Sequence, residues 1–192
     1  MYKNMCEILQ EKKQGVASLE KYEARGFGAM REGIAQGEYI KLSINGTLMM
    51  SNTSMEKRTS MEFVINAEGD VLICGLGIAL VIMPLLEKES VKTITVVEKY
   101  RDVIDIVLPQ IQGYDKENKL NVICEDCFEY IPEKKYDTIF IDIWAYVNED
   151  VYKEEMLPLK RKYRKYLTES GKQKKNIFVW AEKQARYNQR LY

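Results

Sequence analysis

The sequence predicts an α/β protein built on a Rossmann-like, doubly wound parallel sheet, and two observations carry this prediction. After residue 67, nearly continuous apolar runs alternate with helical patterns, which is typical of parallel strands buried on both faces. The run Val71–Leu80 then passes from an apolar strand through Gly75 and Gly77 into an apolar helix. Glycine at such a turn lets the backbone approach a ligand closely, so the turn predicts a ligand site.

The expected elements of this part alternate strictly along the chain. We expect strands at residues 70–74, 92–98, 120–124, 136–143 and 176–181. We expect helices at residues 78–88, 100–111 and 149–167, with a short helical piece at 126–131. In such sheets ligands bind at the carboxyl ends of the strands, where the strand order reverses.

A small unit, residues 1–66, is expected to precede this domain, residues 67–192. Residues 4–25 are charged and lack proline, which we interpret as a helix. Residues 26–33 are interpreted as a glycine-punctuated loop or short helix.

A β-hairpin and a helix are expected to complete the first unit. Alternating runs at residues 38–44 and 47–51 flank Asn45-Gly46, and this pattern is a strong hairpin signal. Residues 52–66 predict a helix that starts at one of the polar residues 52–54. Because a two-stranded hairpin is marginal alone, it must pack on the following domain.

The composition excludes several function classes. The 192 residues include 29 Lys+Arg, 29 Asp+Glu and no histidine. Without histidine, Ser-His and Cys-His nucleophilic mechanisms are excluded, and proton transfer must use carboxylates, Tyr, Lys, Cys or water. The zero net charge argues against a dedicated nucleic-acid binder at the level of the whole chain.

The sequence also bears on location and metals. It contains no run of about 18 apolar residues, and its polar N-terminus lacks a signal-peptide core, so no membrane association is expected. Four cysteines in a chain of this size predict reduced thiols and a cytoplasmic protein. Cys124 and Cys127 form a lone C-x-x-C pair, which is more often incidental than metal-binding, so no metal is expected.

The C-terminal region is locally basic, and two interpretations stay open. It is a solvated helix face, or it is a patch for the phosphates of a nucleic acid or an anionic substrate. The basic residues concerned are Lys160, Arg161, Lys162, Arg164, Lys165, Lys172, Lys174 and Lys175.

Acidic residues follow three of the expected strands. Glu98 ends the second strand, about 20 residues after the glycine turn, where a carboxylate can accept hydrogen bonds from ribose hydroxyls. Asp126 follows the third strand and is a candidate acceptor for an adenine edge, and Asp142 follows the fourth and is a candidate base. Each residue also has a structural interpretation, since carboxylates stabilise helix starts and turns. Their joint occurrence favours a nucleoside site.

The sequence resembles class I S-adenosylmethionine (SAM)-dependent methyltransferases from about residue 37 to 182, and most of all their spermidine synthase (aminopropyltransferase) branch. Its G-L-G and D-I-W motifs also resemble small uncharacterised methyltransferase-like proteins of phages and bacteria. The segments that carry the resemblance are Leu42-Ser43-Ile44-Asn45-Gly46, Val71–Leu80, Glu98, Asp102-Val103-Ile104, Glu125-Asp126-Cys127-Phe128-Glu129-Tyr130 and Tyr136–Ala145.

The resemblance implies a site for SAM or decarboxylated SAM, with Asp142 beside the sulfonium as the acceptor of a proton from the attacking amine. It implies cofactor contacts by Gly75, Leu76, Gly77, Glu98, Lys99, Asp126, Cys127, Asp142 and Ile143. Candidate substrate residues are Trp144 and Tyr146, which can stack on a planar group, and the acidic Glu56.

The sequence departs from this family at several positions that serve polyamine recognition. Ile78 replaces a family aspartate, Ala145 replaces the second aspartate of the D-S-S-D motif, and Met49 replaces a hairpin glutamine. Because few residues follow the fifth expected strand in the sequence, we expect a sheet without the family's final antiparallel strand pair. A second subunit or the tail is expected to protect the open edge, which leaves a homo-oligomer as one expectation.

Three functions therefore remain, in this order. The first is a SAM-dependent methyltransferase with an unknown acceptor, and the second is an aminopropyltransferase that uses decarboxylated SAM. The third is a non-catalytic nucleoside-binding or interaction module. An NAD-linked enzyme is disfavoured, because the dinucleotide pattern requires a third glycine where Leu80 stands.

Overall fold

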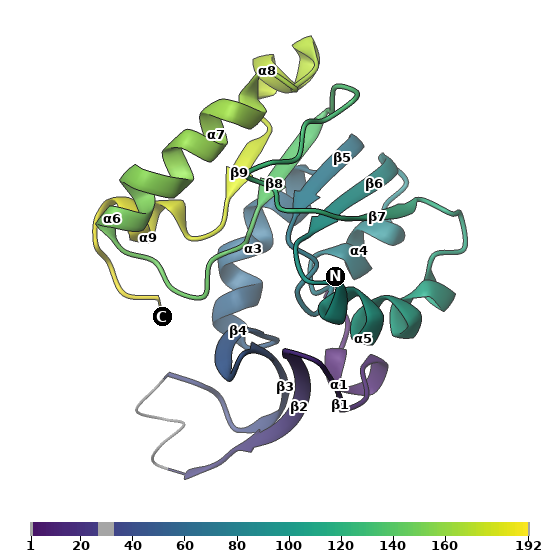
Figure 1. The fold of residues 1–192 in the computed structure, drawn as a ribbon, viewed down its shortest axis with the longest axis vertical. Coiled ribbons are helices and arrows are strands. Elements are labelled where there is room, and N and C mark those ends of the chain that lie inside the picture. Colours follow the sequence, from purple (N-terminus) through teal and green to yellow (C-terminus); the bar gives the residue numbers. More distant parts are fainter. Residues whose placement is uncertain (1, 27–32, 192) are drawn as a thin grey trace.

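A computed structural model describes residues 2–26 and 33–191, and it contains two sheets (Figure 1). The larger sheet is parallel, with strand order β7-β6-β5-β8-β9. Its strands are β5 (Gly69–Cys74), β6 (Val91–Glu98), β7 (Leu120–Cys124), β8 (Thr138–Ile141) and β9 (Ile177–Val179). The expected Rossmann-like α/β fold is confirmed. The strand order reverses between β5 and β8, so the expected ligand crevice lies at the ends of these two strands.

Helices cover both faces of this sheet (Figure 1). They are α3 (Ser54–Asn66), α4 (Ile82–Leu86), α5 (Arg101–Ile111), α6 (Glu149–Val151), α7 (Leu157–Arg164), α8 (Glu169–Lys174) and α9 (Glu182–Arg186), with the 3₁₀ turn η1 (Gln112–Tyr114) and the π-helical turn η2 (Tyr152–Met156). In the described part of the chain, no helix is long and apolar enough to cross a membrane.

The side chains of β5 alternate between two hydrophobic cores. Val71 and Ile73 belong to the core that includes residues of α3, α4 and α5, whereas Leu72 and Cys74 belong to the core that includes residues of α7. Phe63 of α3 stacks on Phe140 of β8 with ring centroids 4.3 Å apart. Burial on both faces explains why these strands read as continuous apolar runs.

The smaller sheet is antiparallel, with strand order β1-β2-β3-β4, and lies against α5. It consists of β1 (Lys12–Gln14), β2 (Ala17–Ala24), β3 (Gly37–Ile44) and β4 (Thr47–Ser51), preceded by the short helix α1 (Met5–Ile8). The expected hairpin is confirmed as β3 and β4, with positive φ at both Asn45 and Gly46. Its apolar side chains join the core of the parallel sheet.

The helix expected over residues 4–25 is wrong beyond α1. Gly15, with φ of +50°, turns the chain between β1 and β2. The Asp102 carboxylate at the start of α5 accepts a hydrogen bond from the Val16 N–H at 3.0 Å. Ala17 and Leu19 are buried two residues apart, a strand period that the surrounding charges obscure in the sequence. The loop expected at residues 26–33 falls almost entirely outside the described residues.

Two further helix predictions need correction. The helix expected at 78–88 is reduced to α4. Ala79 has a positive φ, which a helix does not allow, and Pro84 has no N–H to donate to the preceding turn of a helix that started at residue 78. The helical piece expected at 126–131 is a single turn. Pro132 disfavours helical backbone angles at the preceding residue, Ile131, so the turn does not continue. The helix expected at 149–167 spans α6, η2 and α7, and its π-helical turn ends at Met156, two residues before Pro158.

Candidate functional site

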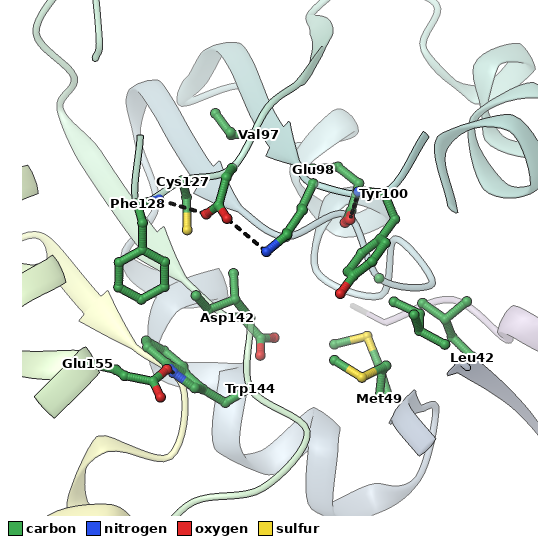
Figure 2. A pocket seen from close by; sticks show the side chains of 17 residues that line it. Leu42, Met49, Val97, Glu98, Tyr100, Cys127, Phe128, Asp142, Trp144 and Glu155 are labelled. Atoms are coloured by element: carbon green, nitrogen blue, oxygen red, sulfur yellow. Dashed lines mark hydrogen bonds and ion pairs between the residues drawn. The ribbon is translucent and has the colours of Figure 1, made fainter. Parts of the chain in front are cut away.

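A cavity of about 220 Å³ opens where the carboxyl ends of β5, β6 and β8 meet the hairpin of the smaller sheet (Figure 2). One wall comes from the strand ends and the other from β3 and β4. Its lining residues are Leu42, Ile44, Met49, Met50, Gly75, Gly77, Val97, Glu98, Lys99, Tyr100, Asp126, Cys127, Phe128, Asp142, Ile143, Trp144 and Glu155.

The glycine turn after β5 forms the floor of this cavity. Gly75 has a φ of +100°, and a Cβ atom there would lie 2.1 Å from the backbone oxygen of Asp142. Gly77 has a φ of +52°, and a Cβ atom there would lie 2.5 Å from the Met50 sulfur. A side chain at position 75 therefore cannot be accommodated without moving the end of β8.

Glu98 is buried at the end of β6 and holds the glycine turn in place. Its carboxylate accepts hydrogen bonds from the backbone N–H groups of Leu76 and Tyr100, each at 2.9 Å. Burial raises the pKa of Glu98, and these backbone donors oppose the rise. Leu76 thus contributes a backbone donor to Glu98 and does not line the cavity. The N–H groups of Gly77 and Lys99 also point toward this carboxylate and oppose the rise, so Glu98 is surrounded by backbone donors while it lines the cavity.

Asp126 is fixed by two contacts in the turn after β7. It forms an ion pair with Lys99 at 2.9 Å and accepts a hydrogen bond from the Phe128 N–H at 2.9 Å. Partial burial raises the pKa of Asp126, but the Lys99 ammonium and the Phe128 N–H outweigh it, and the net result is a lowered pKa. Asp126 is therefore a charged acceptor at the rim of the cavity.

Asp142 follows β8 and directs its carboxylate into the cavity, near Trp144 and Met49 (Figure 2). Within residues 2–26 and 33–191, no hydrogen bond or ion pair holds this side chain. Burial, and then the charge of nearby Glu56, raise the pKa of Asp142 well above its ordinary value. An acid with a raised pKa accepts a proton more readily than an ordinary aspartate does.

Glu56 on α3 lies outside the cavity lining and is 5% exposed. Its Oε2 atom is buried and has no hydrogen-bond partner in the described part of the chain. Burial raises the pKa of Glu56 to about 7, against an opposing N–H of Ser51. Glu56 and Asp142 are therefore two electrostatically coupled acids, of which only Asp142 faces the cavity.

The remaining predicted site residues divide between the cavity and the surface. Ile143 and Cys127 line the cavity, and the buried Trp144 lines it while donating its Nε1–H to Glu155 at 2.7 Å. Tyr146 does not line it and is 65% exposed. The structure therefore brings together every predicted residue except Leu76, Tyr146 and Glu56.

Sequence reasoning missed several residues of the lining. Tyr100 and Phe128 stand next to predicted site residues, so their proximity in sequence was an available signal. Glu155 and Met50 reach the cavity only through the packing of η2 and of the hairpin. No sequence pattern indicates these last two.

Fold and site together define a Rossmann-like α/β protein with a cavity at the point where the strand order reverses. The particular family follows from a comparison with family models, in which residues 52–187 match the spermine/spermidine synthase domain. The chain belongs to this family. No curated protein matches it significantly.

Solved structures share the fold at low identity. Spermidine synthase from Thermotoga maritima is 17% identical, with a TM-score of 0.52 over 84% of this chain and 53% of that chain. A spermidine synthase in complex with the transition-state analogue AdoDATO is 16% identical, with a TM-score of 0.52 over 83% and 52%. A methyltransferase-like structure from Thermoplasma acidophilum is 19% identical, with a TM-score of 0.43 over 54% and 42%. The chain spans about half the length of these solved proteins.

Proposed function

We propose that the protein is a transferase that binds SAM and catalyses methyl transfer to a nucleophilic acceptor. The observation that carries the proposal is the meeting of three features in one cavity: a turn that excludes side chains, the buried carboxylate of Glu98, and the unpaired acid Asp142. Membership of the spermine/spermidine synthase family supports a ligand that contains an adenosyl group.

Each part of the cavity suits one part of such a ligand. Glu98 lines the cavity, and its carboxylate can share its oxygens between the backbone donors and the ribose hydroxyls. Asp126 is charged and can accept from the exocyclic amine of adenine. The side-chain-free turn at Gly75 and Gly77 leaves room for close approach of the ligand to the backbone.

Asp142 is assigned the proton-accepting role. In a transfer from a sulfonium, a bond forms between the nucleophile and carbon while the carbon–sulfur bond breaks, and the nucleophile loses a proton. Asp142 is the cavity acid with no partner among the described residues, and its raised pKa makes its carboxylate a stronger base than an ordinary aspartate. The cavity walls align nucleophile and carbon, which is the main source of rate in such displacements.

A second candidate is aminopropyl transfer from decarboxylated SAM to an amine. The coupled pair Glu56 and Asp142 favours it, because a cationic amine is stabilised near two acids, and the family match agrees. Against it stand Ile78, Ala145 and Met49, which take the places of polar family residues, and Met49 presents an apolar wall to the cavity.

Identification of the nucleoside product separates the two candidates. The protein is incubated with SAM or with decarboxylated SAM and a panel of amines, and nucleosides are resolved by chromatography. Methyl transfer releases S-adenosylhomocysteine, and aminopropyl transfer releases methylthioadenosine. We expect amine-dependent S-adenosylhomocysteine from SAM. If methylthioadenosine forms only when decarboxylated SAM and an amine are both present, the second candidate is supported. If neither SAM nor decarboxylated SAM gives a product that depends on the amine, transfer to amines is contradicted.

A further inference from the structure

A groove with an excess of positive charge runs along β9, the edge strand of the parallel sheet. It consists of two adjoining cavities of about 480 and 340 Å³, which share Lys160, Lys175, Ile177 and Glu182. The helix α7 runs beside β9 at this edge (Figure 1). We call this surface the β9 groove. It is separate from the cavity that contains Asp142, with which it has no lining residue in common.

Five cations of the β9 groove have no acidic partner within the described ranges. They come from four parts of the fold: Arg58 from α3, Arg161 and Arg164 from α7, Lys175 from the turn before β9, and Lys183 from α9. The other two cations are paired, Lys160 with Glu182 and Lys172 with Glu169. Two carboxylates, Glu62 and Glu182, also line the groove, against seven cations.

This concentration of charge contrasts with the rest of the chain. The net charge of the whole sequence is zero, yet unpaired cations from four elements converge on one groove. Like charges held close together repel one another, and a bound anion relieves the repulsion. Arginine also supplies planar, bidentate donors for phosphate. The charge distribution therefore fits a ligand with several phosphates better than a single small anion.

Apolar side chains form part of the lining of both cavities. Ile177 is buried and lines both of them, whereas Phe178, the next residue of the strand, faces the other side of the sheet and lines only the second cavity. The ring of Phe178 is half-buried, with its centroid 6.0 Å from that of Phe63. An apolar and aromatic lining beside several cations is the combination that binds single strands, since bases pack on the lining while phosphates meet the cations. A duplex keeps its bases stacked inside and does not use such a lining.

We propose that the β9 groove binds a single-stranded nucleic acid. The five unpaired cations contact the phosphates, and Phe178 packs against a base. RNA and single-stranded DNA share this chemistry. The inference does not rest on the proposed transferase activity, because it concerns a different surface.

Fluorescence anisotropy with labelled U-rich RNA and T-rich DNA tests the proposal. Strands of about 20 nucleotides exceed a single-strand site of roughly 4–16 nucleotides. With a slope of about −0.7 per phosphate contact, five contacts predict a roughly 100-fold loss of affinity between about 50 and 200 mM salt. The variant Arg161→Ala/Arg164→Ala/Lys175→Ala keeps two contacts, and its affinity should fall only roughly sevenfold over the same range and be weaker at low salt.

A matched control is Lys13→Ala/Lys92→Ala/Lys116→Ala, which removes the same charge from exposed positions outside the groove. Thermal unfolding verifies that both variants fold. The control should bind both strands as tightly as the wild-type protein does. Binding of either strand supports the proposal, and the strand that binds more tightly, RNA or DNA, identifies the preferred nucleic acid. Absence of binding at low salt, or equal losses of affinity in the two variants, would overturn the proposal. Labelled polyglutamate that binds the groove as tightly as the RNA and DNA strands would also overturn it.

Discussion

The carboxylates at the ends of β6 and β8 flank β5 on either side, yet their surroundings are opposite. Glu98 is held by the N–H groups of Leu76 and Tyr100, whereas Asp142 has no partner among the described residues. Glu98 thus belongs to a complete hydrogen-bond network that also lines the cavity. Asp142 has an incomplete environment, which the acceptor is proposed to complete. The difference teaches that position in the fold brings a residue to a site, and its partners decide what it does there.

The largest expected effect comes from the turn that separates the two acids. Gly75→Val should abolish detectable binding of SAM, because its Cβ would collide with the backbone oxygen of Asp142. Calorimetric titration measures the affinity, with thermal unfolding as the test of folding. Gly113→Val is the matched control, since a Cβ there meets nothing within 4 Å. Normal binding by folded Gly75→Val would falsify the placement of the ligand at the turn.

The Asp142 side of the comparison is tested by Asp142→Asn. Loss of a general base should lower turnover by about 10²–10⁴-fold. Affinity for SAM should stay within about threefold, since the asparagine keeps the size of the side chain. Turnover of the wild-type protein should rise with pH as Asp142 loses its proton, because its pKa is raised. Weaker SAM binding with unchanged single-turnover rate would instead make Asp142 a ligand-binding residue.

Glu56 sharpens the comparison through stability. Its carboxyl has a pKa of about 7 in the folded protein against an ordinary value of 4.5, so the folded state retains a proton that the unfolded state loses between these pH values. Folding stability therefore falls as pH rises from 4.5 through 7, by up to about 3 kcal/mol. Glu56→Gln removes the contribution of Glu56 to this pH dependence. The free energy of unfolding of the variant, relative to that of the wild-type protein, should therefore be higher at pH 8 than at pH 4.5.

Urea unfolding at the two pH values measures the effect. The control is Glu62→Gln, which removes an exposed carboxylate from the same helix. The control should not change the pH dependence. An unchanged dependence in Glu56→Gln contradicts a proton held at this buried site.

The Glu98 side gives the smallest loss of function expected among the variants. Glu98→Ala should weaken SAM binding by about tenfold, because a hydrogen bond to a charged group contributes about 1.5–3 kcal/mol and water partly replaces it. It should also lower the melting temperature, since the Leu76 and Tyr100 N–H groups lose their acceptor. A lower melting temperature with unchanged SAM affinity assigns Glu98 to the turn alone.

The parallel sheet was predictable from sequence because most positions of its strands are apolar. The hairpin was predictable because Asn45-Gly46 sets the turn. The strands β1 and β2 were not, since their exposed positions carry charges and their buried positions, such as Ala17 and Leu19, acquire meaning only through packing.

The same division holds for the candidate site. Gly75, Gly77, Asp126 and Asp142 were predicted to meet because parallel strand ends converge, and they line one cavity. Tyr146, only two residues beyond the cavity-lining Trp144, points outward and is exposed. Glu155 and Met50 come from elements whose approach depends on tertiary packing, so local sequence does not reveal them.

The central claim is that the cavity binds an adenosyl group, and calorimetric titration of the wild-type protein tests it most directly. SAM, decarboxylated SAM, methylthioadenosine and NAD are titrated in parallel under the same conditions. We predict saturable binding of SAM and of methylthioadenosine, which shares its adenosyl part, with weak or no binding of NAD. Absence of binding by all three adenosyl sulfur compounds would contradict the account and leave the glycine turn and Glu98 with structural roles only.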